Sequence, residues 1–128
     1  MVIAGVITWT VVTSTLSDQR ITVSDDADCM AGRQVQDPVS AYCQAMVINK
    51  HTLEATGGKT YAELEQDDPA RETAMTSAFL QASLFTSVVA FGVAAMAVVL
   101  GILFTLIGFA LRPGHQGAPV SQRGAHEA

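Results

Sequence analysis

The stretch from Ser83 to Leu111 constrains this chain more than any other feature. Its twenty-nine residues include no charge and no proline, and only hydroxyls and glycines relieve its apolar character. A helix rises about 1.5 Å per residue, so about 20 apolar residues cross a hydrocarbon core roughly 30 Å thick. The stretch exceeds that length, and Arg112-Pro113-Gly114 ends it. We therefore predict a transmembrane helix over 83–111.

Small side chains recur within this span at steps of three and four, which places them on one helix face. Lipid gives helices little hydrophobic drive to associate, so association depends on the close backbone approach that small residues permit. We expect this face to pack on the chain's own first apolar segment or on a helix of another protein. The opposite face, which we expect to meet lipid, carries Val88, Met96, Val99, Ile102, Leu103 and Leu106. The predicted packing residues are Ser83, Ser87, Ala90, Ala94, Ala97, Gly101, Thr105 and Gly108.

Residues 1–16 form a second uncharged apolar run. Sixteen helical residues reach only about 24 Å, which is short for a bilayer. A signal peptide is one interpretation, but no Lys or Arg precedes the run and Val12-Thr13-Ser14 is a poor cleavage site. We favour a first transmembrane helix that starts upstream of Met1.

These two spans define the expected architecture, an all-α membrane protein in which a mostly helical insert over 17–82 joins two transmembrane helices. Arg112 and Arg123 follow the second span, and the positive-inside tendency then places both termini in the cytoplasm. The acidic insert would be extracytoplasmic, and the Gly-, Pro- and Ser-containing tail over 112–128 would be disordered when free.

Within the insert, capping signals predict four helix starts. Ser24 would cap a short helix that ends at Gly32, and Asp37-Pro38 would start a longer one that ends at Gly57-Gly58. Thr60 and Glu63 fit a capping box, and Asp68-Pro69 would start a helix of about 43 residues that continues into the membrane span.

The two cysteines, Cys29 and Cys43, fall on two of these predicted helices in the insert. An extracytoplasmic location permits oxidation, and closing a loop of about 15 residues stabilises a fold by roughly 3 kcal/mol in the chain-entropy model. We predict a disulfide, and two free buried thiols are the alternative.

Catalytic and cofactor-binding patterns are missing from the sequence. Thr56-Gly57-Gly58-Lys59-Thr60 ends like a phosphate loop, but Leu53 stands where that motif needs glycine. His51 and Glu54 share a helix face without further ligands nearby in sequence, and the spans contain no ionisable side chain of the kind that marks an ion pathway. We expect no enzyme activity, no cofactor and no metal site, and the net charge of −5 argues against nucleic acid.

Several segments resemble a family of small actinobacterial membrane proteins often catalogued as "aromatic ring-opening dioxygenase". The segments are 21–27, 49–51, 54–64 and 83–93, and the run Ala55-Thr56-Gly57-Gly58-Lys59-Thr60-Tyr61-Ala62 is the most specific. The residues do not support the catalogued activity, because an extradiol iron site needs His and carboxylate ligands in one pocket. This chain departs from the family at Cys29 and Cys43.

Small two-span proteins of this kind are also similar to accessory subunits of the actinobacterial respiratory supercomplex, the cytochrome bc–cytochrome oxidase assembly. We therefore expect a non-enzymatic accessory subunit of a larger membrane complex, with other membrane proteins and the lipid bilayer as its partners. The alternative is an envelope protein that binds lipid or a small ligand in a groove along Val39, Tyr42, Met46 and Val47.

Overall fold

The computed structural model describes residues 1–112, and the predicted disordered tail lies almost wholly outside them. Three α-helices and one short 3₁₀-helix form the fold: α1 (Val2–Asp18), α2 (Pro38–Ala55), η1 (Tyr61–Glu63) and α3 (Ala70–Ala110). No strand occurs in this part of the chain, where a single antiparallel bridge joins Thr22 to Gln34. The predicted all-helical class is therefore confirmed for residues 1–112.

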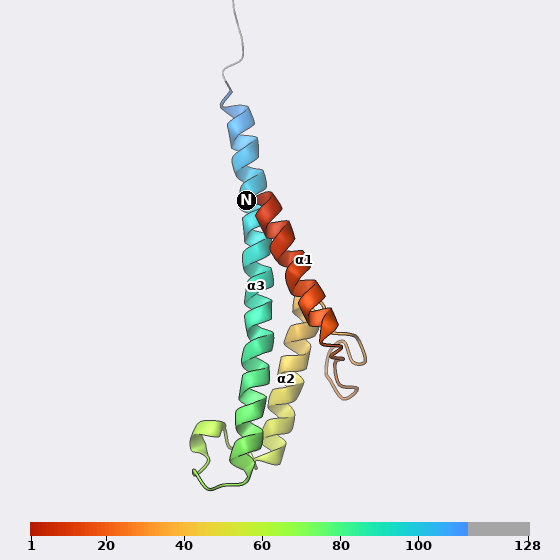
Figure 1. Cartoon of the computed structure of the whole chain (residues 1–128), viewed down its shortest axis with the longest axis vertical. Helices are drawn as coiled ribbons and strands as arrows, with labels where there is room; N and C mark the ends of the chain where they lie inside the picture. The colour runs from red at the N-terminus through yellow and green to blue at the C-terminus, as the bar shows by residue number, and fades with distance from the viewer. Residues whose placement is uncertain (113–128) are drawn as a thin grey trace, which may run out of the picture.

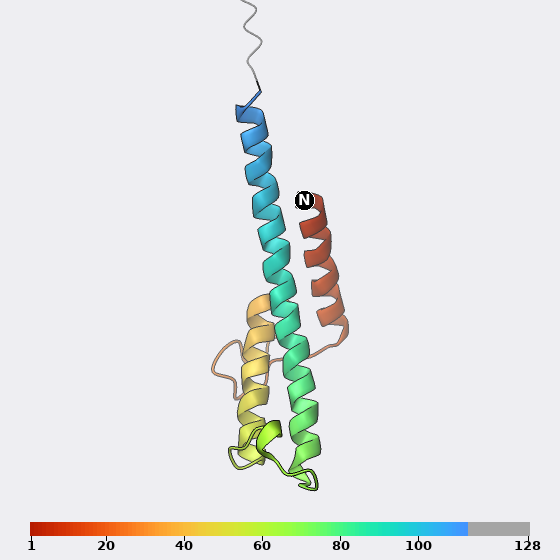
Figure 2. The same cartoon turned by 90° about the vertical axis from the view of Figure 1, so that its left-hand side faces the viewer.

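Helix α3 is the axis of the molecule, and α1 and α2 both pack along it (Figure 1). Its 41 residues extend about 62 Å at 1.5 Å per residue. Figure 2 shows α2 beside the N-terminal half of α3 and α1 beside its middle. The C-terminal turns of α3 continue past the start of α1 without a partner in the described chain.

The long helix begins where its capping signal predicts. Asp68 Oδ1 accepts a hydrogen bond from the backbone N–H of Ala70 at 2.8 Å, and Pro69 stands at the cap. The predicted 43 residues become 41, and α3 is long and apolar enough to cross a membrane. Helix α1 is a shorter apolar helix of 17 residues.

Helix α2 also begins and ends at its predicted signals. Asp37 Oδ1 accepts hydrogen bonds from the N–H groups of Val39 and Ser40, and the Ser40 hydroxyl accepts one from the N–H of Asp37. At the other end Gly57 and Gly58 take φ angles of 64° and 85°, which favour glycine. The N–H of Gly58 donates to Leu53 O at 2.7 Å and closes the helix end.

The connection from α2 to α3 contains the predicted capping box at Thr60. The N–H and hydroxyl of Thr60 donate to Glu63 Oε2 at 2.8 and 2.9 Å. These hydrogen bonds lower the pKa of the Glu63 carboxyl. The third predicted helix is reduced to a single 3₁₀ turn, η1.

The predicted helix from Ser24 to Gly32 is wrong. Residues 19–37 form a folded-back loop in which the N–H of Val23 donates to Arg33 O and the N–H of Val35 donates to Ile21 O, each at 2.8 Å. Val23 and Val35 are fully buried against the helices. Burial of this valine pair outweighs the weak helix preference of the intervening Asp residues, which favour turns.

Candidate functional site

Two glycines allow α1 and α3 to approach closely. A Cβ atom at Gly5 would lie 2.6 Å from the Ala94 carbonyl oxygen, and one at Gly101 would lie 2.8 Å from the Val2 backbone nitrogen. Both distances are too short for any side chain larger than hydrogen. Ala94 is 1% exposed at the centre of this contact. The α1–α3 interface is therefore a small-residue contact of the type that serves helices in lipid.

The interface widens as its side chains become larger. Trp9 of α1 packs edge-to-face on Phe91 of α3, with ring centroids 4.7 Å apart, and Phe91 is 1% exposed. Further along, Leu16 and Leu84 are buried in the core that also holds Val23. Figure 1 shows α1 leaning away from α3 towards its C-terminal end, next to the start of α2.

The predicted small-residue face meets three different environments. Ala94 and Gly101 contact α1, and half-buried Ala97 lies between them in sequence. Thr105 and Gly108 lie beyond the start of α1, and no described side chain lies within 4 Å of a Cβ built at Gly108. The remaining members, Ser83, Ser87 and Ala90, line a groove between the helices.

The predicted lipid-facing residues of α3 are exposed with one exception. Val88 is half-buried and packs against the core, so its assignment to the lipid face was wrong. The exposed residues are Met96, Val99, Ile102, Leu103 and Leu106.

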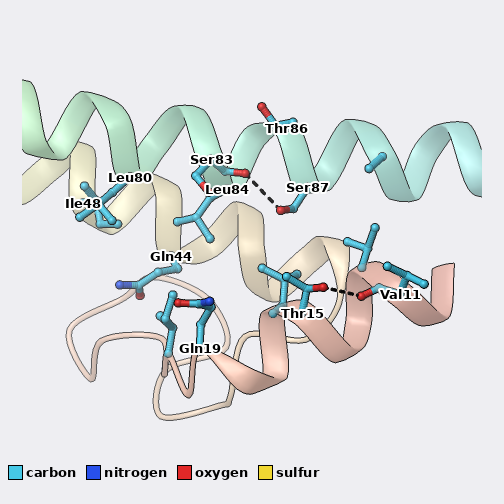
Figure 3. Close-up of a pocket in the computed structure, with 14 residues that line it drawn as sticks. Val11, Thr15, Gln19, Gln44, Ile48, Leu80, Ser83, Leu84, Thr86 and Ser87 are labelled. Carbon is cyan, nitrogen blue, oxygen red and sulfur yellow. Dashed lines mark hydrogen bonds between the residues drawn. The ribbon is translucent and has the colours of Figure 1, made fainter. Parts of the chain in front are cut away.

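The groove has a volume of about 610 Å³, and it opens where α1 and α3 diverge (Figure 3). Residues from α1, the loop after it, α2 and α3 all contribute to its walls. Sequence reasoning missed it because its walls come from segments far apart along the chain. The lining residues are Val11, Val12, Thr15, Leu16, Gln19, Ile21, Gln44, Ile48, Leu80, Ser83, Leu84, Thr86, Ser87 and Ala90.

Most hydroxyls of the groove are already paired with their own helices. Thr15 donates to Val11 O at 2.8 Å, Thr86 to Ala82 O at 2.7 Å and Ser87 to Ser83 O at 3.1 Å. Such hydroxyls present mainly their carbon atoms to a neighbouring molecule.

Gln44 is the most deeply buried polar residue of the groove. It is 9% exposed, and its Oε1 accepts a hydrogen bond from the N–H of Ser24 at 3.0 Å. Its Nε2 has no hydrogen-bond partner among residues 1–112. The sequence contained a signal for this site, since Gln44 interrupts an otherwise apolar helix face of Ala41, Ala45 and Ile48.

The predicted disulfide is present. Cys29 in the loop and Cys43 on α2 are bonded, with Cα atoms 5.8 Å apart. Only one of the two lies on a helix, because Cys29 belongs to the folded-back loop. The bond fixes that loop to α2.

The predicted ligand groove along α2 is formed by only two of its four predicted residues. Val47 is 5% exposed and belongs to the buried side, whereas Val39, Tyr42 and Met46 are exposed. Tyr42 packs against Phe85 of α3 with ring centroids 6.1 Å apart. Met46 and Val47 line a pocket of about 350 Å³ beside the disulfide, and Val39 and Tyr42 do not contribute to it.

An exposed ion pair joins the loop to α2 near the disulfide. His51 Nε2 lies 2.5 Å from Asp26 Oδ2. The hydrogen bond with His51 holds the pKa of the Asp26 carboxyl below its ordinary value of 3.8. Within residues 1–112, no group of three His, Cys, Asp or Glu side chains is close enough to hold a metal ion.

The fold and its surfaces thus define a helical protein with one helix long and apolar enough to cross a membrane. No family model, no curated protein and no solved structure matches this chain.

Proposed function

We propose that this chain is a non-enzymatic accessory subunit of a larger membrane complex, anchored by α3 and α1. The observation that carries this proposal is the exposed apolar surface of α3, in which only 17% of the most apolar 18-residue window is buried. An apolar surface of this extent requires lipid or another apolar protein surface to cover it. Candidate partners are the subunits of the cytochrome bc–cytochrome oxidase assembly, on the resemblance described above.

The end of α3 beyond Gly101 is the best candidate for a partner helix. The small residues Thr105 and Gly108 continue the face that meets α1 earlier in the helix, and both remain open. A helix of another protein could approach closely there, as α1 does at Ala94.

The disulfide supports an extracytoplasmic location for α2 and the loops around it. Such bonds persist in oxidising compartments and are rare in the cytoplasm. With two spans, both termini would be cytoplasmic, and the stapled insert would present its acidic surface outside the membrane.

A pull-down of the tagged full-length protein from its native membrane in mild detergent, followed by mass spectrometry, tests the proposal. We expect stoichiometric recovery of respiratory subunits or of another membrane complex. Gly108→Leu should reduce that recovery, while Gly92→Leu, at another glycine with no described atom within 4 Å of its Cβ, should not. Recovery of the chain alone, in its wild-type form, would refute the accessory role.

A further inference from the structure

We propose that the groove between α1, α2 and α3 binds one ester-linked acyl chain of a membrane glycerolipid. The site is separate from the open end of α3 and uses different residues. The inference rests on the membrane placement in the proposed function, because a groove beside a transmembrane segment is exposed to lipid.

The size of the groove fits a chain rather than a helix. Its α3 wall runs from Leu80 to Ala90, which corresponds to about 15 Å of helix. A partner helix of that length and about 10 Å across would occupy about 1,200 Å³. The groove holds about 610 Å³, which lies within the range of about 300–1,000 Å³ typical of small-molecule sites.

The chemistry of the groove changes along its length. Val11 and Ala90 line one end, which lies towards the apolar middle of α3. Gln19 and Gln44 lie towards the other end, close to the polar insert, where Ile48 and Leu80 also contribute to the wall, as Figure 3 shows. A lipid matches this arrangement when its chain points into the span and its ester lies at the glutamines.

The amide of Gln44 supplies the polar contact. Its Oε1 is engaged by Ser24, and its Nε2 is an uncharged donor without a partner among the described residues. This nitrogen is accessible from the groove, because Thr13 Oγ1 is the one fully buried side-chain nitrogen or oxygen without a hydrogen bond among the described residues. An ester carbonyl is a neutral acceptor that such an accessible donor can bind. An uncharged donor gives no preference for the charge of the head group, so the ester and the chain are what the groove recognises.

Native mass spectrometry of the full chain, extracted from membranes in mild detergent, tests the proposal. We expect one retained glycerolipid per chain. Ala90→Phe fills the groove and should lower the retained fraction at least fivefold. Ala82→Phe, the same change at an exposed residue of α3 outside the groove, should leave the retained fraction unchanged.

A second variant protects the test against misfolding of Ala90→Phe. Gln44→Glu keeps an oxygen for the Ser24 N–H and removes the amide donor, so it should lower retention about threefold or more at pH 7 with the disulfide intact. Equal retention in wild type, Ala90→Phe and Gln44→Glu would overturn the proposal, as would a retained polypeptide in place of lipid. If partners are recovered normally while retention is insensitive to these changes, the groove proposal fails and the accessory role stands.

Discussion

Gly5→Ala tests the α1–α3 contact most directly. The new Cβ atom would lie 2.6 Å from the Ala94 carbonyl oxygen and 2.7 Å from Val98 Cγ2. The carbonyl is backbone and cannot rotate away. Lengthening that contact from 2.6 to 3.4 Å, the start of the ordinary range, requires α1 to move outward by about 0.8 Å. A gap of that size forfeits a quarter to a half of the dispersion energy of the atoms it separates.

Two effects of opposite sign determine the change in the free energy of unfolding. Alanine is about 1 kcal/mol more favourable than glycine inside a helix. Overpacking a close contact costs about 1–3 kcal/mol. Gly5→Ala should therefore range from neutral to about 2 kcal/mol less stable than wild type. Gly92→Ala has no described atom within 4 Å of its new Cβ and should gain about 1 kcal/mol.

The single tryptophan provides the assay. Trp9 packs on Phe91 across the same interface, so its fluorescence should report a separation of α1 from α3. Unfolding by increasing the SDS fraction in mixed micelles, followed by Trp9 emission, gives the stabilities of both variants. We expect Gly92→Ala to exceed Gly5→Ala by about 1–3 kcal/mol. Equal stabilities with unchanged emission would refute the close contact between these helices.

Three further predictions concern the outer part of the molecule. Replacing Cys29 and Cys43 by serine should lower the free energy of unfolding by about 3 kcal/mol, measured by thermal melting, and a reductant should have the same effect on wild type but none on the variant. The pKa of Asp26 is lowered in the fold, so the ionised carboxylate stabilises the folded state above its ordinary pKa of 3.8, and this stabilisation is lost as the pH falls through the lower folded pKa. Asp26→Asn should therefore reduce the acid-induced drop in melting temperature below about pH 4. The control variant Asp67→Asn should not. Asp37→Ala removes the acceptor at the start of α2 and should cost about 0.5–2 kcal/mol in the same melting assay, whereas a cost below about 0.2 kcal/mol would contradict the capping role.

Local signals predicted the helices well because each helix end satisfies its backbone groups with nearby residues. The Asp37-Pro38 start, the Gly57-Gly58 end and the Asp68-Pro69 start all depend on contacts within a few residues. The long apolar run predicted that α3 is a helix and predicted its length closely, because the observed bounds differ from the predicted ones by one residue at each end.

Long-range contacts explain what the sequence could not predict. Ser24 followed by several Asp residues has the composition of a helix start, yet its N–H is bound by Gln44, twenty residues away. The loop is further held by the Cys29–Cys43 bond and by burial of Val23. A pattern confined to 24–32 includes none of these partners.

The groove itself follows from a gradient of side-chain size along α3. At the Gly101 end, glycine and alanine allow α1 to lie close to α3. The Trp9–Phe91 pair holds the two helices farther apart, and Leu84 holds them farther apart still, at the level where α2 joins the core. The two helices, held close at one end and apart at the other, leave a wedge-shaped space between them. The same small-residue face therefore serves two purposes, a tight helix contact at Ala94 and one wall of an open groove at Ala90, only four residues apart. Bulky substitutions at these two positions should therefore have different effects. A bulky residue at Ala94 should separate the helices and lower the free energy of unfolding. A bulky residue at Ala90 should fill empty space and lower lipid retention without lowering the free energy of unfolding.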